Sequence, residues 1–313
     1  MIRLSRERMV RLAGLFREAR DRRKARRQER RQRDRRDGAC PEGMAPLRIA
    51  TWNIHSSVGT DARFDPARIA EVIRALDVDL IALQEVGWHH RGEIGLDQFA
   101  FLAEATGMSA YAGPTKHNIR AHYGNCVLSR LPVIAFRPFD ISAGAHREPR
   151  GAVEVVVESG GHPIRVIAAH LGLDPWERAQ QVERILSVVD EKPGLPTVFM
   201  GDLNEWTRTS PRLRRLAAAF EDMASPRSFH ARLPTLRLDR IYVRHARLAA
   251  FEVIRTKATR HASDHLPVRA VIGVGDTTYF PLPVGEREAP VTPAATAADK
   301  APPAPAAGSG RRG

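Results

Sequence analysis

The feature that most restricts the fold is a series of short apolar runs, each bounded by a polar residue of a kind that is rare in protein cores. The runs are IATWN, LIALQE, VIAAH, VFMGDLN, DRIYV and DHLPVRAVI. One polar residue at such a place is usually a cap or a turn residue. Polar groups at many strand ends can instead converge on one rim of a sheet, where the apolar segments fix their positions. The candidate site residues are therefore Asn53, Glu85, His170, Asp202, Asn204, Asp239, Asp264 and His265.

Strand patterns alternate with helical patterns between residues 46 and 273. We expect strands at 47–53, 79–83, 126–128, 152–158, 165–169, 197–200, 240–243, 249–254 and 268–272. We expect helices at 66–76, 98–106 and 175–189, with Asp65 and Asp174 as N-caps of the first and third. The SGGH segment at 159–162 predicts a hairpin. Hairpins mixed with strand–helix units predict an α/β fold with mixed sheets and helices outside.

The charge is spread unevenly along the 313 residues, which carry a formal net charge of +13. The first 37 residues hold 16 Lys or Arg and 6 Asp or Glu, whereas the remaining residues hold 33 and 30. We expect three regions. Residues 1–45 form a basic extension that is partly helical or disordered, 46–273 form the globular domain, and 274–313 form a Pro/Ala-rich disordered tail.

The basic extension has three interpretations. It is a solvated tail, or an arm that makes weak contact with an anionic membrane or with nucleic acid. In the third, the chain starts at Met44, directly before the core pattern begins.

Several classes of protein are disfavoured. The two cysteines, Cys40 and Cys126, make neither a disulfide framework nor a zinc site. No apolar run reaches about 18 residues, and the Arg-rich N-terminus lacks the apolar centre of a secretory signal. We therefore expect a cytoplasmic monomer, with peripheral contact at the membrane as an alternative.

The residue types of the candidate site favour a hard cation. Carboxylates, amides and histidines without a cysteine cluster suit Mg²⁺ or Mn²⁺ better than structural zinc. A carboxylate at the end of a buried strand is costly unless it is paired. A cation that offsets charge, a base that orients water and donors for the oxyanion together allow hydrolysis of a phosphoester.

Seven sequence blocks, taken in order, resemble the endonuclease/exonuclease/phosphatase superfamily, which has the DNase I-like fold. They are TWNIH (51–55), LIALQEV (80–86), GNCVLSRLP (124–132), AAHLG (168–172), GDLNEW (201–206), LDRIYV (238–243) and SDHLPV (263–268). Each block alone is weak evidence, but their order and separation are specific. The resemblance implies a four-layer α/β/β/α sandwich with two central mixed sheets, and a metal-dependent phosphoester hydrolase with its catalytic domain over 46–273.

The resemblance also implies the metal ligands. Glu85 would be the principal ligand, with Asn53 nearby and Asp264 as a further ligand. The expected cofactor is Mg²⁺, for which Mn²⁺ can substitute. The roles of two further residues stay open: Asn125 either braces a loop or takes part in the site, and Arg150 either caps the strand after Pro149 or reaches the substrate phosphate.

Catalytic roles follow from the same resemblance. Asp202 would orient or deprotonate the attacking water. Asn204 would position a phosphoryl oxygen, and His170 would donate a hydrogen bond to another. His265 would polarise the phosphate, with Asp239 orienting its imidazole.

The branch of the superfamily is indicated by His170, which stands where abasic-site endonucleases have a tyrosine. In having a histidine here, the chain resembles the sphingomyelinase-like and phosphatase branches. It also resembles bacterial phosphodiesterase-like members of the superfamily. Our first hypothesis is a phosphodiesterase or phosphatase that acts on a lipid head group or a small phosphoester. The second is a Mg²⁺-dependent nuclease, an endonuclease or exonuclease, with the Arg-rich arm bound to nucleic acid. The third is a non-catalytic binding module, which is disfavoured because no main motif is missing.

Overall fold

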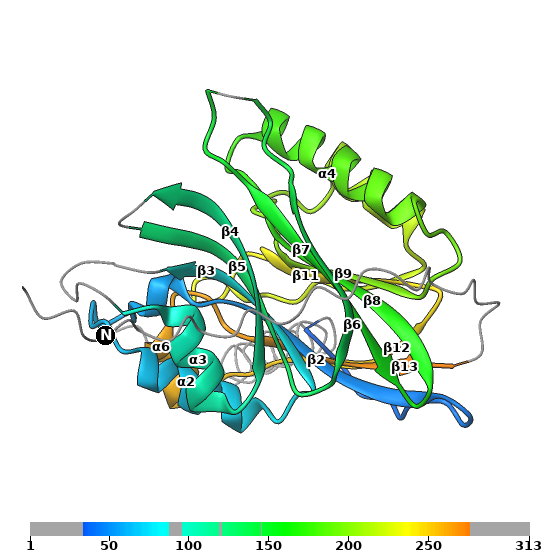
Figure 1. Cartoon of the computed structure of the whole chain (residues 1–313), viewed down its shortest axis with the longest axis horizontal. Coiled ribbons are helices and arrows are strands. Elements are labelled where there is room, and N and C mark those ends of the chain that lie inside the picture. Colours follow the sequence, from blue (N-terminus) through cyan, green and yellow to red (C-terminus); the bar gives the residue numbers. More distant parts are fainter. Residues whose placement is uncertain (1–33, 88–95, 119–120, 145, 276–313) are drawn as a thin grey trace, which may run out of the picture.

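A computed structural model describes residues 34–87, 96–118, 121–144 and 146–275 of the chain (Figure 1). Most of the basic extension and nearly all of the Pro/Ala-rich tail lie outside the described residues, so the limits of the three regions remain predictions. Within the described part, none of the helices has the length and apolar character needed to span a membrane.

The first sheet has seven strands in the order β1-β12-β13-β2-β3-β5-β4. Only the β2–β3 pair is parallel, so the sheet is mixed. The strands are β1 (Arg35–Arg36), β12 (Arg247–Val253), β13 (Val268–Val274), β2 (Ala45–Asn53), β3 (Leu80–Gly87), β5 (Ala121–Ser129) and β4 (Ser109–Asn118).

The second sheet has six strands in the order β10-β11-β9-β8-β7-β6. Here only the β8–β9 pair is parallel. The strands are β10 (Asp222–Ala224), β11 (Asp239–Arg244), β9 (Thr197–Asp202), β8 (His162–His170), β7 (Gly151–Ser159) and β6 (Val133–Asp140). The expected hairpin at 159–162 is confirmed, because Ser159 pairs with His162 at the end of β7 and β8.

The two sheets pack face to face, and helices cover their outer faces (Figure 1). The shared core between the sheets combines residues such as Ile49 and Leu80 of the first sheet with Val155 and Met200 of the second. The helices are α2 (Pro66–Leu76), α3 (Gln98–Thr106) and α6 (Lys257–Ala262) on the first sheet, and α4 (Pro175–Asp190) and α5 (Pro211–Ala219) on the second, with a short 3₁₀ turn η1 (His55–Ser57) after β2. The four-layer sandwich expected from the sequence is confirmed.

The local signals explain why α2 and α4 form where they do. Asp65 accepts a hydrogen bond from the backbone N–H of Arg68, and Asp174 does the same for Trp176. These bonds satisfy N–H groups that a helix start leaves unpaired. Both helices then begin at a proline, whose fixed φ suits the first helical position.

Some regular elements were not expected from the sequence. Most of the segment 113–123 lies in the β4–β5 hairpin, and the segment 205–235 contains α5 and β10, although neither was expected to hold these elements. The strand β6 also escaped prediction. It carries Pro138 and is the last strand in its sheet, a position where a missing N–H donor is tolerated. Within the expected extension, Arg35–Arg36 form β1 and pair with β12.

Candidate active site

The candidate residues lie at one end of the two sheets. Asn53, His170 and Asp202 are the last residues of β2, β8 and β9, Glu85 is near the end of β3, and Asp239 begins β11. Because β2 runs parallel to β3, and β8 parallel to β9, the carboxyl ends of each pair meet at the same edge. The sheet topology therefore brings together residues that are up to 186 positions apart in the chain.

Asn53 links the two sheets at this edge. Its Nδ2 donates to Glu85 Oε1 at 2.8 Å and to Asp202 Oδ2 at 3.1 Å. Its Oδ1 accepts the backbone N–H of His55 at 3.0 Å, and its carbonyl accepts the Ser263 hydroxyl at 2.7 Å. The amide thus holds two carboxylates together through its nitrogen, while its oxygen braces the turn after β2.

Glu85 reaches the site because β3 is irregular at this point. The register of β3 against β5 shifts between Leu83 and Val86, and Glu85 has a φ of 58°. A bulge of this kind re-aims a side chain relative to the regular alternation of a strand, and non-glycine residues at positive φ often mark functional sites. Tyr123 lies next to Glu85, and burial together with this carboxylate raises the pKa of the Tyr123 hydroxyl.

Asp202 is fully buried and lies close to several polar groups. Its Oδ1 accepts the backbone N–H of Asn204 at 2.9 Å, while its Oδ2 lies 3.5 Å from His265 Nε2 and 3.6 Å from His170 Nε2. Burial opposes ionisation of Asp202, but the neighbouring His265 and His170 and the hydrogen bonds from Asn204 and Asn53 lower the pKa of the carboxyl below its ordinary value. Asp202 is therefore a carboxylate at neutral pH.

The glycine that precedes Asp202 in the GDLNEW block is required for steric reasons. Gly201 has a φ of 149°, and a Cβ at this position would lie 1.8 Å from the carbonyl oxygen of Ala169 on the neighbouring β8. Only glycine permits both this conformation and this approach. Gly201 thereby allows β9 to lie against β8 with Asp202 in register with His170.

His170 is held in its neutral form. Burial lowers the pKa of the imidazole, although Asp202 opposes this effect. Its Nε2 lies 2.9 Å from Asn204 Nδ2, which also donates to the carbonyl of Leu171 at 2.8 Å. An amide nitrogen can only donate, so Nε2 accepts and the ring proton resides on Nδ1.

His265 is held in its charged form. Its Nδ1 lies 2.8 Å from Asp239 Oδ2, and both side chains are buried. Burial alone would lower the pKa of His265, but Asp239 and Asp202 raise it to about 10. The ring is further fixed by Trp52, whose indole Nε1 donates to the His265 carbonyl at 2.9 Å. The two histidines of the site thus have opposite charge states at neutral pH.

Asp264 is half-buried beside His265, and its Oδ1 accepts the Ser263 hydroxyl at 3.3 Å. The same hydroxyl accepts the backbone N–H of His265 at 3.2 Å. Ser263 also donates to Asn53 as described above, so the SDH segment before β13 is tied directly to the end of β2. The expected metal ligands Glu85, Asn53 and Asp264 therefore lie on three segments of the same site.

The donor set fits a divalent cation. Side-chain atoms of Asp202, Asp239 and His265 lie within 4.8 Å of one another, and because the charged His265 ring cannot coordinate a cation, the carboxylates are the donors of this group. Asp239 Oδ1 is buried with no hydrogen-bond partner in the described part of the chain. Asn53 connects this group to Glu85. Burial raises the pKa of Asp239 against the attraction of His265, as expected where carboxylates gather without a full complement of cations.

Asn125 and Arg150 lie at the side of the site. They line a small cavity together with Glu85, Tyr123 and His170. Asn125 Nδ2 donates to the Gly151 carbonyl at 2.7 Å, and Arg150 donates to Glu148 at 2.7 Å, while Arg150 Nε is buried without a partner. Asn125 thus braces the strand that follows Arg150, as one of the two sequence-based alternatives expected.

Two supporting residues were missed in the sequence. Glu205 is buried and accepts hydrogen bonds from Arg212 and Thr207, both at 2.7 Å. Its Oε2 also lies 3.7 Å from Arg178 Nε, and Arg178 donates to the carbonyls of Gly172 and Leu173 in the loop after His170. Glu205 and Arg178 thus connect the loop after Asn204 with the loop after His170. The signal for Glu205 was its place in the GDLNEW block.

Two mixed sheets between helices, with a buried centre of carboxylates, amides and histidines, define a DNase I-like hydrolase. The chain belongs to the endonuclease/exonuclease/phosphatase family, whose model matches residues 50–265. Members of this family are phosphoester hydrolases that generally depend on a divalent metal, so the protein is an enzyme of this class.

Comparisons with individual proteins agree with the family. The Escherichia coli K12 protein YbhP, described as uncharacterized, is 30% identical over 243 residues, which cover 72% of this chain and 96% of YbhP. An endonuclease/exonuclease/phosphatase structure from Beutenbergia cavernae is 26% identical, with a TM-score of 0.60 over 74% of this chain and 72% of that one.

Two structures with named activities share the fold. A mannosyl-6-phosphatase from Bacteroides thetaiotaomicron is 17% identical, with a TM-score of 0.59 over 72% of this chain and 99% of that one. D. rerio TDP2 complexed with a single-strand DNA product is 16% identical, with a TM-score of 0.57 over 72% of this chain and 98% of that one. At these identities the likeness concerns the fold alone.

Proposed function

We propose that this protein is a Mg²⁺-dependent phosphodiesterase or phosphatase that acts on a lipid head group or a small phosphoester, with Mn²⁺ as a substitute cation. The observation that carries the proposal is the contact of Asn53 with both Glu85 and Asp202, which places two carboxylates from different sheets on one amide nitrogen. A buried and a half-buried carboxylate held this close favour a bound cation.

The proposed metal ligands are Glu85 and Asp264, with Asn53 beside them. Oxygen donors of this kind suit Mg²⁺, whose preference is for carboxylate and water ligands. When bound, the cation offsets negative charge on the phosphoryl oxygens and leaves the phosphorus open to attack.

The attacking water is the proposed target of Asp202. Its carboxylate is ionised at neutral pH and can accept a proton from a water held at Oδ2. The charged His265 ring lies 3.5 Å from the same oxygen and can donate to a phosphoryl oxygen as negative charge develops. Asp239 keeps that ring protonated and oriented.

The remaining contacts position the substrate. The neutral His170 carries its proton on Nδ1 and can donate it to a phosphoryl oxygen, while Asn204 fixes the ring through Nε2. Arg150 lines the adjoining cavity with a buried, unpartnered Nε, and this favours the alternative in which it reaches a substrate oxygen.

A nuclease is the second candidate, since a structure of this fold holds a single-strand DNA product. The Arg-rich arm would then anchor nucleic acid, although it is not required by a site that cleaves a small phosphoester. Replacing the basic run Arg22, Arg23, Lys24, Arg26 and Arg27 by glutamine separates the two. In a nuclease, this variant would bind DNA more weakly, and its DNA affinity would depend less on salt concentration. In a head-group hydrolase, the variant would keep its turnover on a soluble substrate.

The test is a substrate panel. Purified protein with Mg²⁺ or Mn²⁺ is assayed on bis-p-nitrophenyl phosphate, a phosphomonoester, sphingomyelin-type lipid vesicles and plasmid DNA. We expect metal-dependent release from the lipid or small phosphoesters, abolished by EDTA and by Asp202→Asn. Cleavage of plasmid DNA alone would favour the nuclease, and no cleavage of any member would contradict the proposal.

A further inference from the structure

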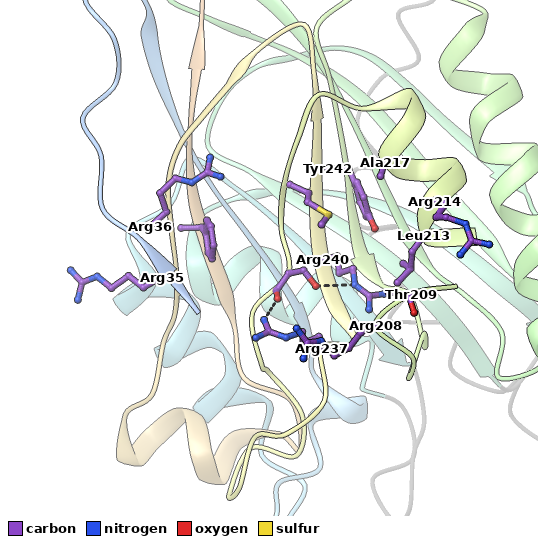
Figure 2. Close-up of a pocket in the computed structure, with 13 residues that line it drawn as sticks. Arg35, Arg36, Arg208, Thr209, Leu213, Arg214, Ala217, Arg237, Arg240 and Tyr242 are labelled. Carbon is purple, nitrogen blue, oxygen red and sulfur yellow. Dashed lines mark hydrogen bonds between the residues drawn. The ribbon is translucent and has the colours of Figure 1, made fainter. Parts of the chain in front are cut away.

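A large basic pocket lies away from the catalytic residues, at the β10 edge of the second sheet. Its volume is about 850 Å³, and it is bordered by β1, β11 and β12 and by the segment that leads into α5 (Figure 2). Among the described residues, no Asp or Glu lines it. The arginines that line it are Arg35, Arg36, Arg208, Arg214, Arg237 and Arg240.

Three of these arginines are neutralised by nearby carboxylates. Arg35 pairs with Asp37 at 2.6 Å, Arg36 pairs with Asp222 at 2.6 Å, and Arg237 Nη2 lies 3.1 Å from Asp34. They set the walls of the pocket but add little net positive charge to it.

The other three form no ion pair with a described residue, although burial lowers the pKa of Arg240 and the negative charges of Glu205, Asp202 and Asp239 oppose this. Arg208 and Arg214 are exposed, and neither forms an ion pair within the described ranges. Arg240 is only 2% exposed, and its Nη1 has no hydrogen-bond partner there. Its other contacts are with Ser225 Oγ at 3.0 Å and the Glu205 carbonyl at 3.1 Å, both neutral.

Arg208 and Arg240 lie close to Arg237, whereas Arg214 lies apart from them on α5 (Figure 2). Figure 2 draws Arg208, Arg237 and Arg240 gathered on one side of the pocket, with Arg35 and Arg36 on the other. Burial and repulsion from Arg227, Arg208 and Arg240 lower the pKa of Arg237, while Asp34 opposes them. Gathered cations with an unsatisfied buried donor are costly unless an anion joins them.

We propose that this pocket binds a small anion with two or more phosphate groups. Three guanidinium groups without an ion pair among the described residues exceed what one phosphate needs, and guanidinium donors match phosphate oxygens. A concave pocket of about 850 Å³ suits a small ligand rather than a flat polymer surface. The pocket does not depend on the proposed catalysis, since Arg240 and Asp239 are neighbours on β11 and their side chains point to opposite faces of the sheet.

The test is calorimetric titration of the full chain with inorganic triphosphate and with orthophosphate, at low ionic strength in EDTA. We expect one triphosphate per chain and an affinity for orthophosphate at least about tenfold weaker. The double variant Arg208→Gln/Arg214→Gln should weaken triphosphate binding by about tenfold or more, since two charge-assisted contacts are lost.

The matched control is Arg247→Gln, since Arg247 is also exposed, forms no ion pair with a described residue and does not line the pocket. It should leave triphosphate affinity within about twofold, and circular dichroism should show both proteins folded.

Three results would overturn the proposal: no binding of triphosphate, binding of orthophosphate as tight as that of triphosphate, or the same loss of triphosphate affinity in the control as in the double variant. If triphosphate does not bind, but anionic vesicles or a single-stranded oligonucleotide bind in a way that requires Arg208 and Arg214, the proposal is wrong. The surface would then be assigned to the membrane or to the nucleic acid. The titration needs neither a divalent cation nor turnover. A negative result would therefore contradict the anion-binding proposal without bearing on the proposed phosphoesterase activity.

Discussion

Glu205 offers a sharp test of how the active-site loops are held. Its side chain is 3% exposed, accepts Arg212 and Thr207 at 2.7 Å each, and lies 3.7 Å from Arg178. Burial would raise the pKa of Glu205, but hydrogen bonds from Arg212, Thr207 and Ser210 lower it from 4.5 to about 2. The folded protein therefore favours the ionised form more strongly than the unfolded chain does.

The stabilisation follows from this shift. A difference of about 2.5 pKa units corresponds to about 3 kcal/mol of stability at pH 7. Because the folded pKa is depressed, this contribution is complete above pH 4.5 and is lost as the pH falls toward 2. At pH 3 about 1 kcal/mol remains. The substitution Glu205→Gln resembles the protonated acid, so it should cost about 3 kcal/mol at pH 7 and about 1 kcal/mol at pH 3.

The assay is urea unfolding of wild type and Glu205→Gln at both pH values. Glu183→Gln is the control, because Glu183 also binds an arginine through both oxygens, at 2.9 and 2.8 Å, but that pair is exposed. The control should cost less than about 1 kcal/mol at either pH. Equal costs for the two variants, or a cost of Glu205→Gln that does not change with pH, would refute the reasoning.

Three further predictions concern the catalytic centre. Asp202→Asn should lower turnover by about 10²–10⁴ while cation binding measured by calorimetry stays close to wild type, and near-normal turnover would remove Asp202 from the mechanism. Asp239→Asn should lower the pKa of His265 from about 10, because the attraction and the hydrogen bond of Asp239 that oppose burial are lost while Asp202 remains. The stability that the raised pKa provides is present below pH 6.5 and lost as the pH rises through 10, so the variant should be less stable at pH 7, and an unchanged His265 titration by NMR would contradict this account. Gly201→Ala should cost about 2–4 kcal/mol in thermal unfolding, since its Cβ meets the Ala169 carbonyl, and a wild-type melting temperature would disprove that clash.

The parts of the fold that the sequence predicted carry strong local signals. The bounds of α2 at Pro66–Leu76 and of α3 at Gln98–Thr106 were predicted to the residue. In α2 the aspartate cap, the proline at the first position and the apolar spacing agree. The elements β4, β6, α5 and α6 were missed. Their sequences mix polar and apolar residues, and most of β6 is only partly buried, so packing against neighbouring strands decides their structure.

The candidate site shows the same division. Residues at the ends of apolar strands, such as Asn53 and Asp202, were found because their polarity conflicts with their position. Tyr123 and Glu205 were missed, because Tyr123 reaches Glu85 through strand pairing and Glu205 meets Arg178 across two loops. Neither contact has a fixed sequence spacing, and the same holds for the bulge that turns Glu85 into the site.

The central claim is that Glu85, together with residues far from it in the chain, holds a catalytic divalent cation. Its most direct test is Mn²⁺ titration followed by electron paramagnetic resonance, with hydrolysis of bis-p-nitrophenyl phosphate measured on the same samples. We predict that Glu85→Gln weakens Mn²⁺ affinity by about tenfold or more and lowers turnover in parallel, whereas Glu158→Gln, at an exposed position on β7, changes neither. Identical Mn²⁺ titrations for wild type and Glu85→Gln would contradict the account.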